Sequence, residues 1–176
     1  MTVLLDCINK KTKRNCIWLM RQAGRYLPEF RKIRSQNLDF IKLCLNEDLS
    51  SEITIQPLKR FEIDAAIIFS DILLVPYALG QTVKFEKNYG PLLGDLDYDQ
   101  ISRTEETDFI KKLNPVYNAI KKTKCKKELN NKDLIGFVGA PWTILIYMLN
   151  KKSPKNEDIN INLKNDKLIN DLLKII

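Results

Sequence analysis

Residues 20–26 read Met-Arg-Gln-Ala-Gly-Arg-Tyr and directly follow a short apolar run, Ile17–Met20. The apolar run predicts a strand. Pro28 suits the first turn of a helix, because a proline there loses no N–H group that the helix needs. Gly24, between the two arginines, allows a sharp turn or a close approach to a ligand. We therefore predict a strand, a cationic loop and a helix, in that order.

Arg21 and Arg25 are the candidate anion-binding residues of this loop. Arginine is favoured where a planar, forked donor must hold a carboxylate in a fixed orientation. The alternative is that the two arginines are merely ion-paired with Glu29 at the start of the helix.

Two further runs, Ala65–Phe69 and Leu134–Val138, contain no polar residue. Such runs are typical of parallel strands that are buried on both faces. Val83–Glu86 is expected to form a short strand beyond a turn at Gly80, and Gly90-Pro91 and Gly94-Asp95 predict a loop.

Helices are expected between these strands, from apolar spacing and capping residues. One helix is expected over Val3–Lys10 and another from Pro28. Two more follow, one capped by Asn37 and one capped by Asp48, the latter with a kink at Pro57. Further helices are expected from a Ser102–Glu105 capping box with a restart near Pro115, from Pro141 to Leu149, and over Ile161–Ile176.

Polar groups follow each expected strand, where parallel α/β folds bind their ligands. They are the two arginines, Asp71, and the Gly139–Trp142 turn with Tyr147 behind it. Structural alternatives remain for the last two. Asp71 could cap a helix, and Tyr147 could be a core ring with a satisfied hydroxyl group.

The composition narrows the classes of partner. The 29 basic and 22 acidic residues give a net charge of +7, but the lysines occur in dispersed pairs, so we expect solvated helix faces and no nucleic-acid partner. The chain has four separated cysteines and no histidine, so neither a zinc site nor a disulfide framework is expected. No apolar run is long enough for a membrane span and no signal-like segment stands at the N-terminus, so we expect a cytoplasmic protein without membrane contact.

Three separated segments carry a resemblance to a known family. Trp18–Arg31, Ile67–Leu73 and Gly136–Thr143 resemble, in the same order, three segments of the uroporphyrinogen decarboxylases. The resemblance covers about residues 1 to 150, and agreement over three motifs is far more specific than a lone motif.

The resemblance implies a (β/α)8 TIM barrel and a carboxy-lyase of haem biosynthesis that uses no metal or organic cofactor. Such an enzyme removes CO2 from the four acetate side chains of uroporphyrinogen III and yields coproporphyrinogen III. It also implies a homodimer, which is the usual assembly of the family.

The resemblance further implies a role for each matching residue. Arg21 and Arg25 would hold substrate carboxylates, with Arg21 a candidate proton donor, and Asp71 would accept hydrogen bonds from the pyrrole N–H groups. Tyr147 would contact Asp71 or an acetate, and Ile72 and Phe137 would line the pocket.

The length departs from that pattern. The chain has 176 residues, whereas a closed eight-unit barrel takes about 250. About three of eight βα units are visible, so residues 1–176 are interpreted as the N-terminal part of a single barrel domain with the C-terminal half absent. A truncated product, a split enzyme and a partial record all fit this interpretation.

Two other classes of function stay open. Cobamide-dependent methyltransferases share the fold, but they bind zinc through His and Cys in their C-terminal half and lack the paired-arginine motif. The other alternative is an inactive fragment that binds tetrapyrroles or complements a barrel partner.

Overall fold

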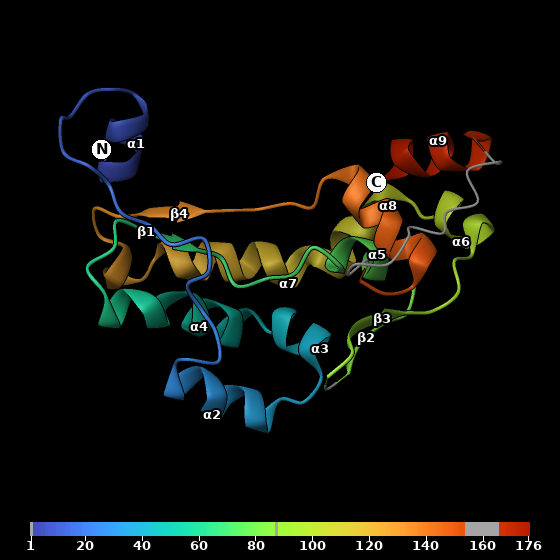
Figure 1. Cartoon of the computed structure of the whole chain (residues 1–176), viewed down its shortest axis with the longest axis horizontal. Coiled ribbons are helices and arrows are strands. Elements are labelled where there is room, and N and C mark those ends of the chain that lie inside the picture. The colour runs from blue at the N-terminus through green and yellow to red at the C-terminus, as the bar shows by residue number, and fades with distance from the viewer. Residues whose placement is uncertain (1, 87, 154–165) are drawn as a thin grey trace. The chain divides into compact units, whose positions relative to one another are not determined.

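The computed structural model describes residues 2–86, 88–153 and 166–176. The chain divides into two compact units, whose elements are labelled in Figure 1. The first unit contains Met1–Leu38, Lys42–Ser70 and Asn114–Phe137; the second contains Asp39–Ile41, Asp71–Leu113 and Val138–Ile176.

A parallel pair of strands, β1 (Ala65–Ile67) and β4 (Asp133–Ile135), lies in the first unit. Ala65 is opposite Asp133 and Ile67 is opposite Ile135, and Ile68 N–H extends the ladder to the Ile135 carbonyl at 3.0 Å. The two apolar runs therefore contain parallel strands as predicted, each only three residues long. The predicted burial on both faces is wrong for the second run, because the residues of β4 are half-buried and Val138 is 90% exposed. The chain is an α/β protein.

The predicted strand at Ile17–Met20 is wrong. These residues are irregular, and their side chains are between 41% and 80% exposed. Two hydrogen bonds join Ile17 to Asp64, the residue before β1. Asp64 N–H donates to the Ile17 carbonyl at 2.7 Å, and Ile17 N–H donates to the Asp64 carboxylate at 2.8 Å. An apolar run becomes a strand only where successive backbone groups find a partner.

Three helices of the first unit, α1 (Val3–Ile8), α2 (Pro28–Gln36) and α4 (Glu47–Arg60), begin close to the predicted positions, but two predicted caps are wrong. The short 3-10 helix η1 (Lys127–Leu129) was not predicted. Asn46, not Asp48, caps α4, since its side chain accepts from Asp48 N–H and Leu49 N–H. Asn37 ends α2 instead of opening the next helix, because its amide donates to the Ile33 carbonyl at 2.9 Å.

Two helices contribute residues to both units, α3 (Phe40–Cys44) and α7 (Glu106–Lys124). Pro115 lies inside α7 without interrupting it, so the predicted restart there is wrong. The loss of one backbone N–H does not end this helix.

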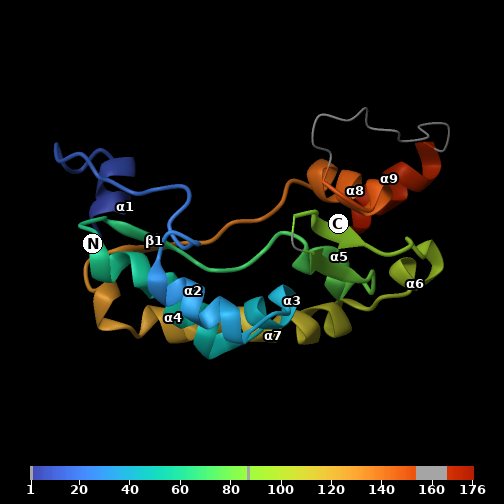
Figure 2. The same ribbon diagram turned by 60° about the horizontal axis from the view of Figure 1, so that its bottom comes forward.

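Helix α4 anchors the end of β1. Ser50 Oγ donates to the Phe69 carbonyl at 2.6 Å, and Phe69 N–H donates to Thr54 Oγ1 at 2.8 Å. Ile55 of α4, Ala66 of β1 and Leu129 of η1 form one buried cluster, and Leu58 and Leu134 pack against this cluster. On the other side of α4 lies α2 (Figure 2).

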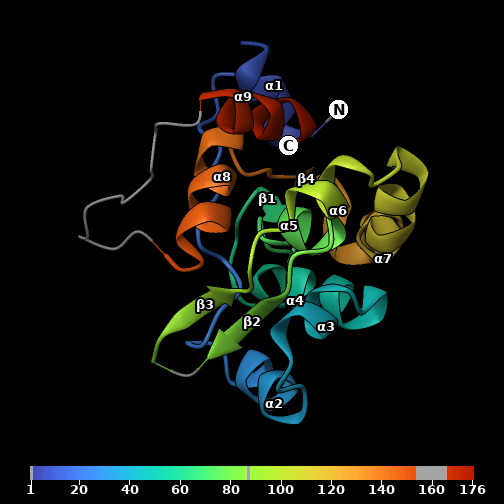
Figure 3. The same cartoon turned by 90° about the vertical axis from the view of Figure 1, so that its right-hand side faces the viewer.

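The second unit contains an antiparallel hairpin, β2 (Val83–Glu86) and β3 (Gly90–Leu93), shown side by side in Figure 3. The strand predicted at 83–86 is confirmed. The loop predicted at Gly90-Pro91 is wrong, because these residues begin β3, with Gly90 at a positive φ of 85°. Such a φ favours glycine and reverses the chain into the second strand.

The described residues of the second unit also form the helices α5 (Leu74–Ala78), α6 (Tyr98–Ser102), α8 (Pro141–Asn150) and α9 (Asp166–Ile175). Pro141 opens α8 as predicted. Ser102 ends α6 and does not cap the helix that follows. Of the predicted helix Ile161–Ile176, the part before residue 166 lies outside the described residues.

Across the described part of the chain, no helix combines the length and the apolar character that a membrane crossing requires. No disulfide joins any of the four cysteines, all of which lie in the described residues. The cytoplasmic location stays a prediction.

Candidate active site

The two arginines of residues 20–26 lie in an exposed turn of the first unit. Leu27 N–H donates to the Gly24 carbonyl at 3.0 Å, which closes the turn just before α2. The side chains of Arg21 and Arg25 are exposed, and neither forms an ion pair with any described residue. Two free guanidinium groups are available to bind an anion.

Glu29 is not the partner of these arginines, so the alternative of a local ion pair is wrong. Its carboxylate is held by Arg60 of α4, with Nε donating to Oε1 at 2.6 Å and Nη2 donating to Oε2 at 2.9 Å. The hydrogen bonds from Arg60 lower the pKa of Glu29.

Gln22, between the two arginines, is a residue that the sequence interpretation missed. Its side chain is 3% exposed. Nε2 donates to the Ala65 carbonyl at 2.8 Å, and Oε1 accepts from Ile67 N–H at 3.0 Å. The available signal was a polar residue two positions after an apolar run, but nothing local indicates that its amide is bonded to β1.

Asp71 follows the end of β1 in the chain and opens the second unit. Its Oδ1 accepts from Leu73 N–H at 2.8 Å, and its carbonyl accepts from Leu74 N–H at 3.2 Å. It therefore shapes the turn before α5; the N-cap position belongs to Leu73, so the helix-cap alternative is wrong.

The carboxyl group of Asp71 is half-buried and has no cationic partner among the described residues. Burial raises the pKa of Asp71, and the hydrogen bond from Leu73 N–H opposes that rise only in part. A half-buried carboxylate with unused acceptor capacity is suited to a ligand that brings N–H donors.

Ile72 and Tyr147 also belong to the second unit. A Cβ on Gly139 would lie 2.8 Å from Ile144 Cγ1 and 3.1 Å from Ile72 Cβ, so the glycine allows residue 72 and the start of α8 to approach closely. The Tyr147 hydroxyl is 3.4 Å from Ser153 Oγ, and no hydrogen bond joins it to Asp71 within the described residues.

Phe137 follows β4 in the first unit and is 42% exposed. The predicted site residues thus form two groups: Arg21, Arg25 and Phe137 in one unit, and Asp71, Ile72 and Tyr147 in the other.

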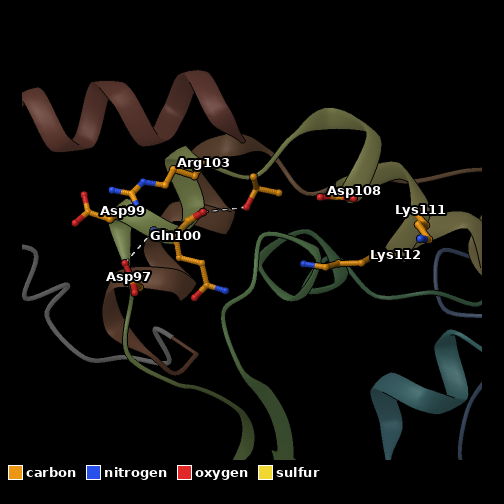
Figure 4. Close-up of a pocket in the computed structure, with 8 residues that line it drawn as sticks. Asp97, Asp99, Gln100, Arg103, Asp108, Lys111 and Lys112 are labelled. Atoms are coloured by element: carbon orange, nitrogen blue, oxygen red, sulfur yellow. Dashed lines mark hydrogen bonds between the residues drawn. The ribbon is translucent and has the colours of Figure 1, made fainter.

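A surface pocket of about 810 Å³ lies elsewhere in the second unit and contains none of these residues. Side chains in and beside α6 form one wall and side chains of α7 form the other (Figure 4). Two of its polar groups already serve the fold: Asp97 accepts from Gln100 N–H at 3.0 Å, and Lys112 Nζ donates to the Ala78 carbonyl at 2.8 Å. We therefore do not assign the active site to it.

Over residues 2–86, 88–153 and 166–176, no three Cys, Asp or Glu side chains gather as they would around a metal ion. The expectation of a reaction without cofactor stays a prediction.

Comparison with known proteins identifies the family. The model of the uroporphyrinogen decarboxylase (URO-D) family matches residues 3–176. The uroporphyrinogen decarboxylase of Campylobacter jejuni is 45% identical over 152 residues, which are 85% of this chain and 44% of that protein. The enzyme of Brucella ovis is 47% identical over 133 residues, 76% of this chain and 39% of its relative.

The chain spans less than half the length of these two relatives. The family match nevertheless extends over nearly every residue, including both groups of candidate site residues. The chain belongs to the uroporphyrinogen decarboxylase family.

Proposed function

We propose that residues 1–176 form the N-terminal part of a single (β/α)8 barrel domain, which further βα units complete. The parallel pair β1 and β4, with α4 and η1 packed on it, supports this proposal. Parallel strands occur almost only in sheets that are covered on both faces.

The completed protein is proposed to decarboxylate the four acetate side chains of uroporphyrinogen III. The substrate carries eight carboxylates and four pyrrole N–H groups, so its site needs cations and a central acceptor. Arg21 and Arg25 supply the cations, because neither guanidinium has an ion-pair partner among the described residues. Each matches an arginine of the family motif.

The observation that carries the proposal is the half-buried carboxyl group of Asp71, which has no cationic partner among the described residues. Its ionised form is disfavoured by burial, and pyrrole N–H donors would compensate that cost. The same carboxylate would stabilise the positive charge that develops when the pyrrole ring is protonated.

The protonated ring accepts the electron pair released when the bond between the acetate methylene and its carboxylate breaks. CO2 leaves, a proton on the methylene carbon completes the methyl group, and the ring returns its own proton. The net change for each acetate is the uptake of one proton. Arg21 is proposed as one proton donor, and Ile72, Phe137 and Tyr147 as residues that line the pocket.

The test replaces each arginine by lysine in the protein completed with its C-terminal βα units. Arg21→Lys and Arg25→Lys keep the charge but lose the planar fork, so we expect kcat/KM for uroporphyrinogen to fall about tenfold or more. Arg103→Lys, an exposed arginine next to α6, is the control and is expected to keep wild-type kinetics.

Wild-type kinetics in both Arg21→Lys and Arg25→Lys would remove the arginines from the mechanism. Porphyrinogen binding without release of CO2 by the completed wild-type protein would instead favour the tetrapyrrole-binding alternative.

A further inference from the structure

We propose that Gln22 is a positioning residue that holds Arg21 and Arg25 in place by acting as a substitute strand on one edge of β1. This inference rests on the proposed function, because it assigns the two arginines to substrate carboxylates.

The amide group of Gln22 bonds to β1 as the peptide group of a neighbouring strand would. Its Nε2 donates to the Ala65 carbonyl at 2.8 Å, and its Oε1 accepts from Ile67 N–H at 3.0 Å. A residue of a parallel neighbour likewise donates to one carbonyl and accepts from the N–H two residues further along.

The two edges of β1 are therefore both occupied. Asp64 and Ile68 bond to β4, with Asp133 N–H donating to the Asp64 carbonyl at 3.1 Å and Ile68 N–H donating to Ile135. On the other edge, the Ala65 carbonyl and the Ile67 N–H are bonded to the Gln22 amide. Because the Gln22 side chain is 3% exposed, water does not readily replace either hydrogen bond.

Other bonds fix the remainder of the turn without using the arginine pair. The Tyr26 hydroxyl donates to the Gln22 carbonyl. The Arg31 guanidinium donates to the Arg25 carbonyl at 2.8 Å and to the Tyr26 carbonyl at 3.3 Å. The backbone of residues 22–26 is thus held at several points, while the side chains of Arg21 and Arg25 remain exposed.

Such an arrangement lowers the entropic cost of gripping a carboxylate, because the backbone beneath the guanidinium groups is already ordered before the ligand arrives. Loss of the Gln22 amide leaves two backbone groups of β1, the Ala65 carbonyl and the Ile67 N–H, without their partner. It also removes the bonds that hold residues 21–25 against β1.

The experiment compares Gln22→Met with Gln81→Met. Gln81 is the matched control, since it is also 3% exposed and its Nε2 donates to two carbonyls, those of Gly94 and Met148. Methionine keeps the length of the side chain and removes the amide. Both substitutions are expected to lower thermal stability.

The first readout is the rate of tryptic cleavage after Arg21 and Arg25 in the completed protein, a measurement that requires no activity. Gln22→Met should be cleaved there about tenfold faster than wild type, and Gln81→Met at the wild-type rate. Gln22→Asn keeps the amide on a side chain one methylene shorter and should be cleaved at an intermediate rate. It replaces Gln22→Met if that variant does not fold.

The second readout is decarboxylation by the completed protein, in which Gln22→Met should raise KM about tenfold and Gln81→Met should leave it unchanged. Equal cleavage of wild type and both Gln22 variants overturns the positioning role, whatever the activity. Faster cleavage with an unchanged KM overturns the link between this segment and the substrate. If the completed wild-type protein has no decarboxylase activity, the proposed function fails while the cleavage assay still decides the role of Gln22.

Discussion

Asp71 combines a structural and a proposed chemical role in one side chain. Its Oδ1 holds the turn before α5, while the half-buried carboxyl group lacks a cation among the described residues. Groups whose burial opposes their ionisation are common at functional sites, where they reduce stability in favour of activity.

We predict that Asp71→Asn makes the chain more stable at neutral pH and the completed enzyme inactive. Burial raises the pKa of Asp71 in the folded chain, so the folded state binds its proton more tightly than the unfolded state. Wild-type stability therefore falls as the pH rises from about 3.8 through the raised folded pKa. Asparagine has no such dependence, and its carbonyl can still accept from Leu73 N–H.

Urea unfolding between pH 4 and pH 8 measures this effect. The free energy of unfolding of Asp71→Asn, relative to that of wild type, should increase with pH and then level off. In a decarboxylation assay, turnover by the completed Asp71→Asn enzyme should be about 100-fold lower than that of wild type. Asp99→Asn, at an exposed carboxylate of α6, should show neither change. A stability difference that is constant across this range would contradict the assigned effect of burial.

At the scale of elements, the turn that carries Arg21 and Arg25 ends where α2 begins, and α2 packs against α4. Arg60 of α4 joins the two helices through its pair of hydrogen bonds to Glu29 of α2. Phe30 of α2 packs edge to face on Phe69, with the ring centroids 5.8 Å apart. Helix α2 is therefore packed on Phe69, the residue after β1 whose backbone is bonded to α4.

We predict that Arg60→Met lowers stability slightly at pH 7 and not at low pH. The hydrogen bonds from Arg60 lower the folded pKa of Glu29, so their contribution is present above its ordinary pKa of 4.5. The contribution is lost as the pH falls through the lowered folded pKa. Thermal unfolding at pH 7 and pH 3 measures the difference, which should also shrink in 1 M salt.

Lys59→Met is the control for this prediction, because Lys59 lies one residue away and its nitrogen is 3.9 Å from Glu128, a looser ion pair. Its effect on stability should be smaller than that of Arg60→Met. An Arg60→Met effect that is equal at both pH values would show that lost packing, and not the ion pair, is responsible.

At the scale of the whole molecule, the apolar run Ile17–Met20 presents four consecutive exposed side chains. Ile17, Trp18, Leu19 and Met20 are 56%, 41%, 45% and 80% exposed. Consecutive exposed apolar residues next to a short parallel sheet favour association with another chain.

We predict that the isolated 176-residue chain is poorly soluble or oligomeric and has no decarboxylase activity. A C-terminal half with the remaining βα units should restore a compact particle and turnover together. Sedimentation velocity and a porphyrinogen decarboxylation assay measure both properties on the same sample. A stable monomer that releases CO2 without a partner would contradict the prediction.

Several elements of this protein could be predicted from local sequence. Pro28 and Pro141 mark the first turns of α2 and α8, because the fixed φ of proline suits a helix start and its missing N–H is not needed there. The runs at 65–69 and 134–138 contain parallel strands, since residues apolar on both faces must be covered on both. Arg21, Arg25 and Asp71 were chosen as candidate site residues from motifs that are continuous in the chain, and their role stays a prediction.

Other features depend on partners that are distant in the chain. Ile17–Met20 is as apolar as β1, yet it forms no strand, because a strand requires a backbone partner and the Gln22 amide occupies that edge of β1. Arg60, 31 residues further along, binds Glu29 and so leaves Arg21 and Arg25 free. The sequence alone determined which residue types could bind an anion or start a helix, since those properties are local. Tertiary structure alone decided which of them were already paired, because hydrogen bonds and burial depend on what the rest of the chain brings into contact.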